Sequence, residues 1–294
     1  MPLLGLGTWE SKPGEVKAAI KSAILDANYT HIDGAKAYHN EPEVGEAYAE
    51  IFSGKTDRKI NREDIFITSK LWNTDHDPEV VEAMCRKTLS DLQLDYLDMY
   101  LIHWGVAFDH SGKDKDGVPV WAPVSVQQTW QAMEKLVEKG LVKSIGVANF
   151  SAPMLVDLMT YAKILPETNQ IELHPYNTQT QLVEFCQAKT ISVTAYSPLG
   201  RIGAVNIPGK KLTEESVILG LAQKYSKTPS QILLNWAISR NTIVIPKSVN
   251  AGRIAENAQV FDFQLAADEV EQVSMLNQNF RFVNPDSLGV PYFA

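Results

Sequence analysis

Cysteine is scarce in this chain of 294 residues, with Cys85 and Cys186 as the only two. No CxxC pair occurs, so the sequence offers neither a disulfide framework nor a thiol-based zinc site, and we predict no metal site. A low cysteine count suits a reducing compartment and predicts a cytoplasmic protein. The first residues, MPLLGLGTWESKPGE, lack the basic start and the long apolar core of a signal peptide.

Long apolar runs and clustered basic charge are also missing. No run of about 18 apolar residues occurs, so no membrane span is predicted. The net charge is −8, from 27 basic and 35 acidic side chains, which argues against a nucleic-acid-binding surface. Apolar residues make up 45% of the chain and charged residues 21%, as in a globular protein of one α/β barrel or two average domains.

A complete glycine-rich turn is also absent. The segment Gly5-Leu6-Gly7-Thr8 has two glycines of the dinucleotide-binding fingerprint without the third, and no helical pattern begins there. An open doubly wound sheet normally carries that turn after its first strand. The absence therefore favours a closed barrel over an open sheet.

The chain does contain a regular alternation of short apolar runs and amphipathic helical patterns. The predicted strands are Leu3–Trp9, Thr30–Gly34, Asp64–Lys70, Leu97–His103, Val142–Asn149, Thr168–Leu173, Ile191–Ser197 and Thr242–Lys247. Helical patterns cover Glu15–Ala27, Pro78–Leu92 and Val126–Lys139, and later helices are expected to begin at Ser151, Thr178, Thr213 and Thr228. Eight strand–helix units predict an α/β fold, a (β/α)8 TIM barrel built by residues 1–294 as a single domain.

Three segments outside these elements are expected to shape one end of the barrel. Gly105–Ser125 and Pro198–Leu212 are long predicted loops after the fourth and seventh strands, and loops of this length are usually functional. The tail Phe280–Ala294 has no periodicity and is expected to fold over the C-terminal face of the barrel.

Four polar residues lie at or just after the ends of three predicted strands: Asp33, Tyr38, Lys70 and His103. In a barrel, loops at the carboxyl ends of the strands carry the chemistry. Lys70 beside Tyr38 would lower the pKa of the phenol, Asp33 would balance the buried ammonium, and His103 would orient a carbonyl group. Together the four residues predict a proton donor for the reduction of a carbonyl group.

Each of these residues also has an ordinary structural explanation when taken alone. Asp33 and Lys70 can form an ion pair at a barrel rim, Tyr38 can be a packed loop aromatic, and His103 can be an interior histidine. The complementary roles of the four together favour a catalytic site.

A second cluster follows the eighth predicted strand. Lys247, Ser248 and Arg253 place two cations and a hydroxyl near a helix start, which suits a phosphate monoester. The alternative is a solvated basic rim. Because the chain as a whole is acidic, the local cluster predicts a phosphate pocket.

At these residues the sequence resembles the aldo-keto reductase family, and within it the aldose and xylose reductase branch. The resemblance runs nearly end to end and is carried by GLGTW (Gly5–Trp9), HIDGAKAYHNEPEVG (His31–Gly45), ITSKLW (Ile67–Trp72), YLIHW (Tyr100–Trp104) and IPKSVNAGRIAEN (Ile245–Asn257). It implies a barrel that reduces aldehydes or ketones to alcohols with NADPH, NADH being a weaker alternative.

The resemblance also implies roles for single residues. The family's catalytic tetrad falls on Asp33, Tyr38, Lys70 and His103. Its cofactor-binding positions fall on Asn149, Gln170, Tyr196, Ser197, Leu199, Lys247, Ser248, Arg253, Glu256 and Asn257. Its substrate-binding positions fall on Trp9, Trp72, His103 and Trp104.

Three positions depart from the family's pattern. Ala148 stands where the family has a serine, which implies the loss of one hydrogen bond to the nicotinamide carboxamide. Gly105 stands where the branch has a proline, which implies a freer loop after it. The cofactor-clamping aspartate that follows Pro198-Leu199-Gly200 in the family has no counterpart, which implies faster cofactor exchange.

The sequence thus predicts an NADPH-dependent reductase of aldoses and small aldehydes, acting as a monomer or weak homodimer on small carbonyl compounds. Two alternatives stay open. A Schiff-base aldolase would use Lys70 or Lys247 as its nucleophile, although Asp33 would keep Lys70 protonated. A binding protein that senses a nicotinamide cofactor would have the same fold with little turnover.

Overall fold

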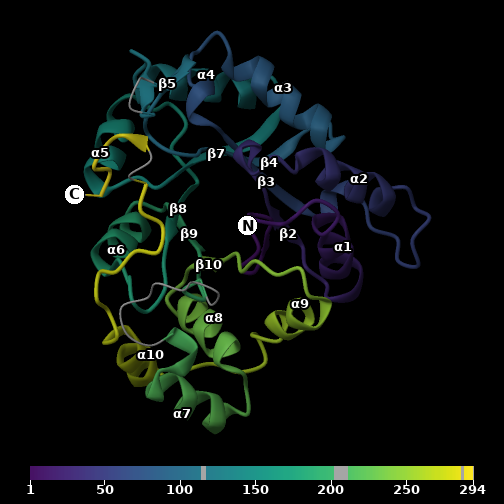
Figure 1. Ribbon diagram of the computed structural model, residues 1–294, viewed down its shortest axis with the longest axis vertical. Coiled ribbons are helices and arrows are strands. Elements are labelled where there is room, and N and C mark those ends of the chain that lie inside the picture. Colours follow the sequence, from purple (N-terminus) through teal and green to yellow (C-terminus); the bar gives the residue numbers. More distant parts are fainter. Residues whose placement is uncertain (114–116, 202–210, 286–287, 294) are drawn as a thin grey trace.

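In the computed structural model, eight parallel strands form one continuous sheet (Figure 1). The structure describes residues 1–113, 117–201, 211–285 and 288–293. In the order in which they pair, the strands are β1 (Leu6–Gly7), β2 (His31–Asp33), β3 (Phe66–Leu71), β4 (Leu97–Ile102), β7 (Val142–Ala148), β8 (Thr168–Glu172), β9 (Ser192–Tyr196) and β10 (Ile243–Val244). All eight predicted strands are confirmed, with shorter bounds because several of their outer residues belong to the connecting loops.

The sheet closes on itself between β10 and the start of the chain. The Val244 amide donates to the Leu3 carbonyl at 2.9 Å, and the Gly5 amide donates to the Val244 carbonyl at 2.8 Å. A β-carbon on Gly7 would lie 2.9 Å from the Ile245 carbonyl oxygen, so only glycine allows this close approach of the two ends. The closure confirms the predicted (β/α)8 barrel.

Helices surround the strands in Figure 1 and bury their apolar stripes against them. They are α1 (Val16–Lys21, continued by a π-helical turn at Ser22–Asp26), α2 (Glu41–Phe52), α3 (Val81–Leu92), α4 (Val126–Glu138), α5 (Ala152–Tyr161), α6 (Thr180–Ala188), α7 (Ser216–Tyr225), α8 (Pro229–Ser239), α9 (Ala251–Ala258) and α10 (Ala267–Ser274). The predicted start at Thr228 is confirmed, because the Thr228 hydroxyl accepts from the Gln231 amide at 3.3 Å and caps α8.

Helices α2 and α10 were not predicted, and for α9 only a helix start near Ser248 was expected. Helix α2 does carry a 3.6-residue period, with Val44, Ala47, Tyr48 and Ile51 all buried. The short helices α9 and α10 have one buried apolar residue each, Ile254 and Val273, too few for a clear periodic signal. The helix predicted to begin at Thr178 begins two residues later.

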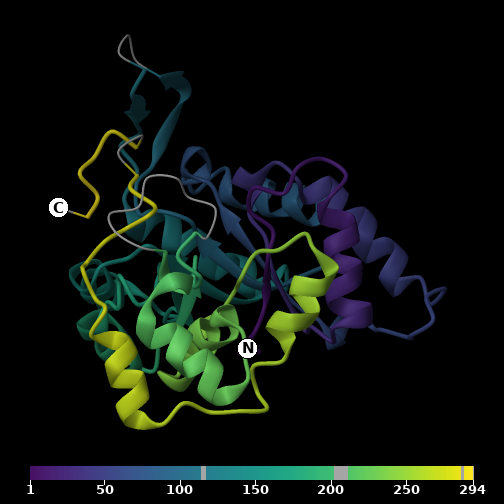
Figure 2. The same ribbon diagram turned by 60° about the horizontal axis from the view of Figure 1, so that its bottom comes forward.

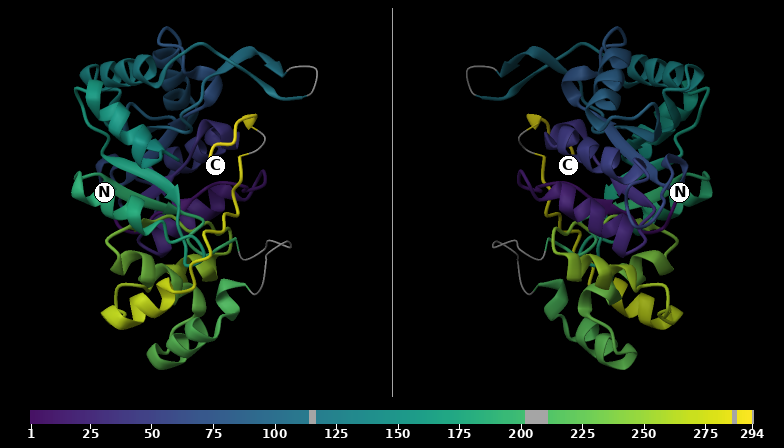
Figure 3. Two further views of the ribbon diagram at one scale, coloured as in Figure 1. Left: turned by 90° about the vertical axis from the view of Figure 1, so that its left-hand side faces the viewer. Right: turned by 90° about the vertical axis from the view of Figure 1, so that its right-hand side faces the viewer.

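The segment Gly105–Ser125, predicted as a loop, contains a β-hairpin instead. Strands β5 (Phe108–Lys113) and β6 (Pro119–Trp121) pair antiparallel. Figures 2 and 3 show this hairpin projecting from the same side of the molecule as the C-terminal tail. The other predicted loop, Pro198–Leu212, falls mostly on residues 202–210, outside the described part of the chain. Within the described ranges, no helix has the length and apolar character needed to cross a membrane.

Candidate active site

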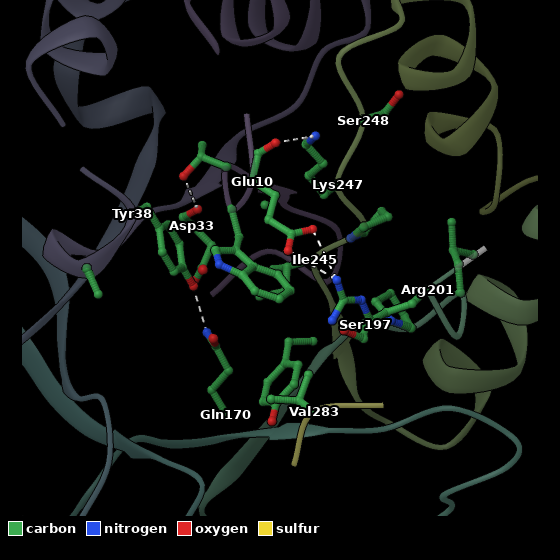
Figure 4. Close-up of a pocket in the computed structure, with 18 of the residues that line it drawn as sticks. Glu10, Asp33, Tyr38, Gln170, Ser197, Arg201, Ile245, Lys247, Ser248 and Val283 are labelled. Atoms are coloured by element: carbon green, nitrogen blue, oxygen red, sulfur yellow. Dashed lines mark hydrogen bonds and ion pairs between the residues drawn. The ribbon is translucent and has the colours of Figure 1, made fainter. Parts of the chain in front are cut away.

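A cavity of about 850 Å³ opens at the carboxyl ends of the barrel strands (Figure 4). It brings together every predicted site residue except Lys70. Those residues are Trp9, Asp33, Tyr38, Trp72, His103, Trp104, Asn149, Gln170, Tyr196, Ser197, Leu199, Lys247, Ser248, Arg253, Glu256 and Asn257. Lys70 is fully buried and contacts the cavity wall from behind.

The Lys70 ammonium connects two of the cavity residues. Its Nζ donates to Asp33 Oδ1 at 2.5 Å, to the Gly34 carbonyl at 2.8 Å and to Tyr38 Oη at 3.2 Å. Strands β2 and β3 place the carboxylate and the ammonium, and a 3-10 turn (Lys36–Tyr38) after β2 places the phenol. Three polar groups from neighbouring strands thus meet as the predicted spacing requires.

The pKa of Tyr38 is set mainly by burial. Burial raises this pKa, and its effect exceeds the opposing effect of the Lys70 charge. Lys70 does lower the pKa of this phenol, as predicted, but the larger effect of burial makes the net shift upward. Burial would lower the pKa of Lys70, but Asp33 and Tyr38 outweigh it and the pKa is raised. At neutral pH the site holds a protonated phenol beside a protonated amine.

His103 is neutral at the same pH. Burial, with the positive charge of Lys70 and the nearby His76, holds its pKa well below the usual range. Its ring packs edge-on against Tyr38 and Trp72, with ring centroids 5.9 Å and 5.2 Å away. The buried Nδ1 atom has no hydrogen-bond partner among the described residues. A neutral imidazole in this position can donate one N–H to a carbonyl oxygen.

Amides from the next strands continue the polar wall. Gln170 Nε2 donates to Asp33 Oδ2 at 2.7 Å (Figure 4). Asn149, at the end of β7 with φ +66°, donates from Nδ2 to the His103 carbonyl at 3.0 Å and accepts from Tyr196 Oη at 2.9 Å. These bonds hold two side-chain amides and an aromatic ring at one side of the cavity.

The opposite end of the cavity is basic. Lys247 and Arg253 are exposed there, and Ser248 lies between them at the start of α9. The Asn250 side chain caps this helix, accepting from the Arg253 amide at 3.0 Å. The positive end of a helix and two cations favour a phosphate group at this position.

Comparisons with known proteins agree with this geometry. The profile of the Aldo/keto reductase family matches residues 3–278. Aldo-keto reductase family 1 member A1 of Mus musculus is 49% identical over an alignment of 292 residues that covers 97% of this chain and 89% of that protein. The solved aldose reductase of Giardia lamblia superposes with a TM-score of 0.92 at 40% identity, over 100% of this chain and 98% of that one. The aldose reductase of Schistosoma japonicum gives 0.91 at 43% identity, over 98% and 93%.

The chain belongs to the aldo/keto reductase family. Its members are oxidoreductases that reduce aldehydes or ketones, and they use a nicotinamide cofactor that is usually NADPH. The recognition of this family from sequence is confirmed.

Two residues at the cavity entrance of this aldo/keto reductase were not found from sequence. Arg201 pairs with Glu10 at 3.1 Å, and its guanidinium lies 4.8 Å from the ring centroid of Trp9. Lys247 Nζ donates to the Glu10 carbonyl at 3.1 Å (Figure 4). Glu10 follows Trp9 directly, and Arg201 follows the Pro198-Leu199-Gly200 segment. Two opposite charges beside two predicted site segments were therefore the sequence signal that could have predicted this ion pair.

The C-terminal tail forms another part of the wall, as predicted. Val283, Asn284, Pro285 and Leu288 line the cavity. The tail is held by the buried Glu172, a residue that sequence reasoning did not single out. Its carboxylate accepts from the Phe282 amide at 2.7 Å, from the Val283 amide at 3.0 Å and from His174 Nε2 at 2.8 Å.

The departures at Ala148 and Gly105 have different consequences. The buried Ala148 packs with Met99 and Leu101, so its side chain offers no hydrogen bond in the site. Gly105 does not lead into a free loop as expected. Its amide donates to Tyr292 Oη at 2.8 Å, and the chain continues into the β5–β6 hairpin.

Proposed function

We propose that this protein is an NADPH-dependent reductase of aldehydes, with aldoses and small aliphatic aldehydes as its leading substrates. The observation that carries the proposal is the Lys70 ammonium, which bonds both Asp33 and Tyr38 beside a neutral His103 at the cavity wall. This set can give a proton to a carbonyl oxygen and stabilise the charge that develops there.

The residues fit a nicotinamide cofactor. The buried Nδ1 of His103 lacks a partner among the described residues, and the cavity volume of about 850 Å³ suits a ligand of this size. Asn149, Gln170 and Tyr196 would hold the nicotinamide end, Ser197 and Leu199 the pyrophosphate and ribose region. The adenine end would lie against Glu256 and Asn257.

The basic end supports NADPH over NADH. Lys247, Ser248 and Arg253 would bind the 2′-phosphate, a group that NADH lacks. Both solved relatives are aldose reductases, which supports aldoses as substrates here. The aromatic rings of Trp9, Trp72 and Trp104 would line the substrate end of the cavity.

A bound nicotinamide cofactor supplies the hydride. Tyr38 donates the proton to the carbonyl oxygen, since burial keeps its phenol protonated at neutral pH. Lys70 then stabilises the phenolate that the transfer leaves, and Asp33 keeps Lys70 charged and in place. His103 orients the carbonyl oxygen with its single ring N–H.

The two alternatives have less support. A Schiff-base nucleophile needs a neutral amine, whereas the pKa of Lys70 is raised by Asp33 and Tyr38. A binding protein with little turnover would not need a proton donor. We further propose that residues 1–294 act as one domain, cytoplasmic and monomeric or weakly dimeric.

The proposal is tested by following NADPH oxidation with aldoses, sugar phosphates, ketones and aliphatic aldehydes, with NADH in parallel. We expect turnover of small aldehydes and aldoses, and a lower KM for NADPH than for NADH. Tight NADPH binding without turnover across the panel would instead support the binding protein. Equal kcat/KM with the two cofactors would remove the assigned preference.

A further inference from the structure

The C-terminal tail is attached to the barrel at two points, one at the end of β8 and one after β4, with only β7 between these two strands. Glu172, at the end of β8, accepts from the Phe282 and Val283 amides. Beyond the cavity-lining part of the tail, Tyr292 Oη accepts from the Gly105 amide, which follows β4, at 2.8 Å. Val283, Pro285 and Leu288 line the cavity between the two attachments. Figure 3 shows the tail running across this side of the molecule.

Gly105 provides room for the second attachment. A β-carbon at this position would lie 2.3 Å from Met154 Cε and 3.1 Å from Tyr292 Oη. A side chain on residue 105 would therefore push against both the α5 side and the tail. A proline would remove the N–H that Tyr292 accepts.

The ring of Tyr292 also supports a wall of the cavity. It packs at 90° against Trp104, with ring centroids 5.1 Å apart. Phe293 lies against the same two rings, and Arg281 lies 3.8 Å from the Phe293 ring centroid. Trp104 is only 7% exposed and lines the cavity. Displacing Tyr292 would thus release both the tail and one face of Trp104.

We propose that Tyr292 is a positioning residue for substrate selection, which fixes Trp104 and the tail wall through its bond to the Gly105 amide. The inference rests on the proposed reductase function. Large aldehydes that reach this wall depend on Tyr292, and small aldehydes that stop short of it do not. Burial raises the pKa of Tyr292 to about 12, so the oxygen that accepts from the Gly105 amide belongs to an uncharged phenol at neutral pH.

The test is Tyr292→Phe, which removes the bonding hydroxyl and keeps the ring. KM and kcat are measured with glyceraldehyde and with a bulky aromatic aldehyde at saturating NADPH. We expect KM for the aromatic aldehyde to rise roughly three- to tenfold, the range for loss of one hydrogen bond. The kcat values, KM for glyceraldehyde and NADPH binding should stay at the parental level.

Tyr225→Phe is the matched control. It removes another phenolic hydroxyl, one that bonds Glu269 away from the cavity lining, and it should change neither KM. Gly105→Pro removes the same bond from the other side. The double variant Gly105→Pro with Tyr292→Phe should therefore have the same KM for the aromatic aldehyde as Gly105→Pro alone. The proposal would be overturned by additive KM increases in the double variant or by unchanged KM values in Tyr292→Phe. It would also be overturned if Tyr292→Phe raised KM equally for both aldehydes.

A second measurement needs no turnover and separates this inference from the proposed function. Trypsin cleavage after Arg281 releases residues 282–294, and intact mass detects the shortened chain. We expect Tyr292→Phe to be cleaved there roughly three to ten times faster than the parent, because loss of one attachment raises the open population. Equal cleavage rates would overturn the attachment itself, whereas a parent without aldehyde turnover would overturn the reductase function.

Discussion

The cavity has a floor and a rim that are built in opposite ways. The floor, consisting of Asp33, Lys70 and Gln170, comes from barrel strands, and the ion pair in it has side chains at most 2% exposed. The rim, consisting of Glu10, Arg201 and the tail, comes from loops. Its ion pair has side chains 33% and 56% exposed. The floor and the rim each contain an ion pair, but the ion pair of the floor is buried and that of the rim is exposed to solvent.

This difference in burial separates two functions. A buried pair interacts strongly and is costly to break, while an exposed pair is screened by water and salt. The floor can therefore fix the ionisation of a proton donor, and the rim can open and close around ligands at low cost. Breaking the floor should abolish chemistry and stability together, whereas breaking the rim should change binding.

Lys70→Met should have the largest effect. It leaves the Asp33 carboxylate buried without its ammonium partner, and such losses cost about 3–5 kcal/mol of the free energy of unfolding. Urea denaturation measures this cost. The double variant with Asp33→Asn removes both charges and should recover most of the stability, though not the activity. Equal stability of the single and double variants would show that the buried charge is not the cause.

Arg253→Ala tests the basic end of the cavity. One charge-assisted bond to a phosphate is worth about 1.5–3 kcal/mol, so KM for NADPH should rise roughly 10- to 100-fold. KM for NADH should change less than about twofold, because NADH has no 2′-phosphate. Arg86→Ala, which removes an exposed arginine paired with Glu82 on α3, is the control. A parallel rise for both cofactors would contradict the assigned contact.

Acid should destabilise the folded barrel through two buried histidines. Burial lowers the pKa of His31, on the same strand as Asp33, and of His76 to about 4. Below the unfolded pKa of about 6.5 the unfolded chain takes up protons that the folded chain excludes, so stability falls as pH drops from about 6.5 to about 4.

Each of these two histidines should cost about 2 kcal/mol by pH 5. Urea unfolding at pH 7 and pH 5 measures the loss, and His76→Gln should make the pH dependence shallower. His39→Gln, at an exposed position, is the control. A variant at position 76 with the parental pH dependence would refute this assignment.

Arg201→Ala should have the smallest effect. An exposed ion pair contributes roughly 0.2–1 kcal/mol, so stability should hardly change while NADPH dissociates a few times faster in stopped-flow displacement. Exchanging the charges with Glu10→Arg and Arg201→Glu should restore slow release at low salt. If Arg201→Ala alters kcat for the chemical step and leaves release unchanged, the rim assignment is wrong.

The sequence predicted the floor better than the rim, for a physical reason. Asp33 and Lys70 end the hydrophobic patterns of two strands, and parallel strands bring their carboxyl ends together, while the role of Gln170 was implied by the family resemblance. Glu10 and Arg201 are 191 positions apart, and Glu172 lies 110 positions before Phe282. No local pattern encodes these contacts between loops. The net rise of the Tyr38 pKa was not predicted for a similar reason, because it comes from burial in the folded site, which outweighs the predicted lowering by Lys70.

The most direct test compares two tyrosines that lie on the two sides of this division. Tyr38→Phe removes a hydroxyl from the reacting site, and Tyr292→Phe removes one from the tail attachment. Steady-state kinetics are measured for both variants with glyceraldehyde and with a bulky aromatic aldehyde. Tyr38→Phe should lower kcat roughly 100- to 10,000-fold with both aldehydes and leave NADPH binding unchanged. Tyr292→Phe should change only KM for the aromatic aldehyde. Near-parental kcat in Tyr38→Phe would contradict the account.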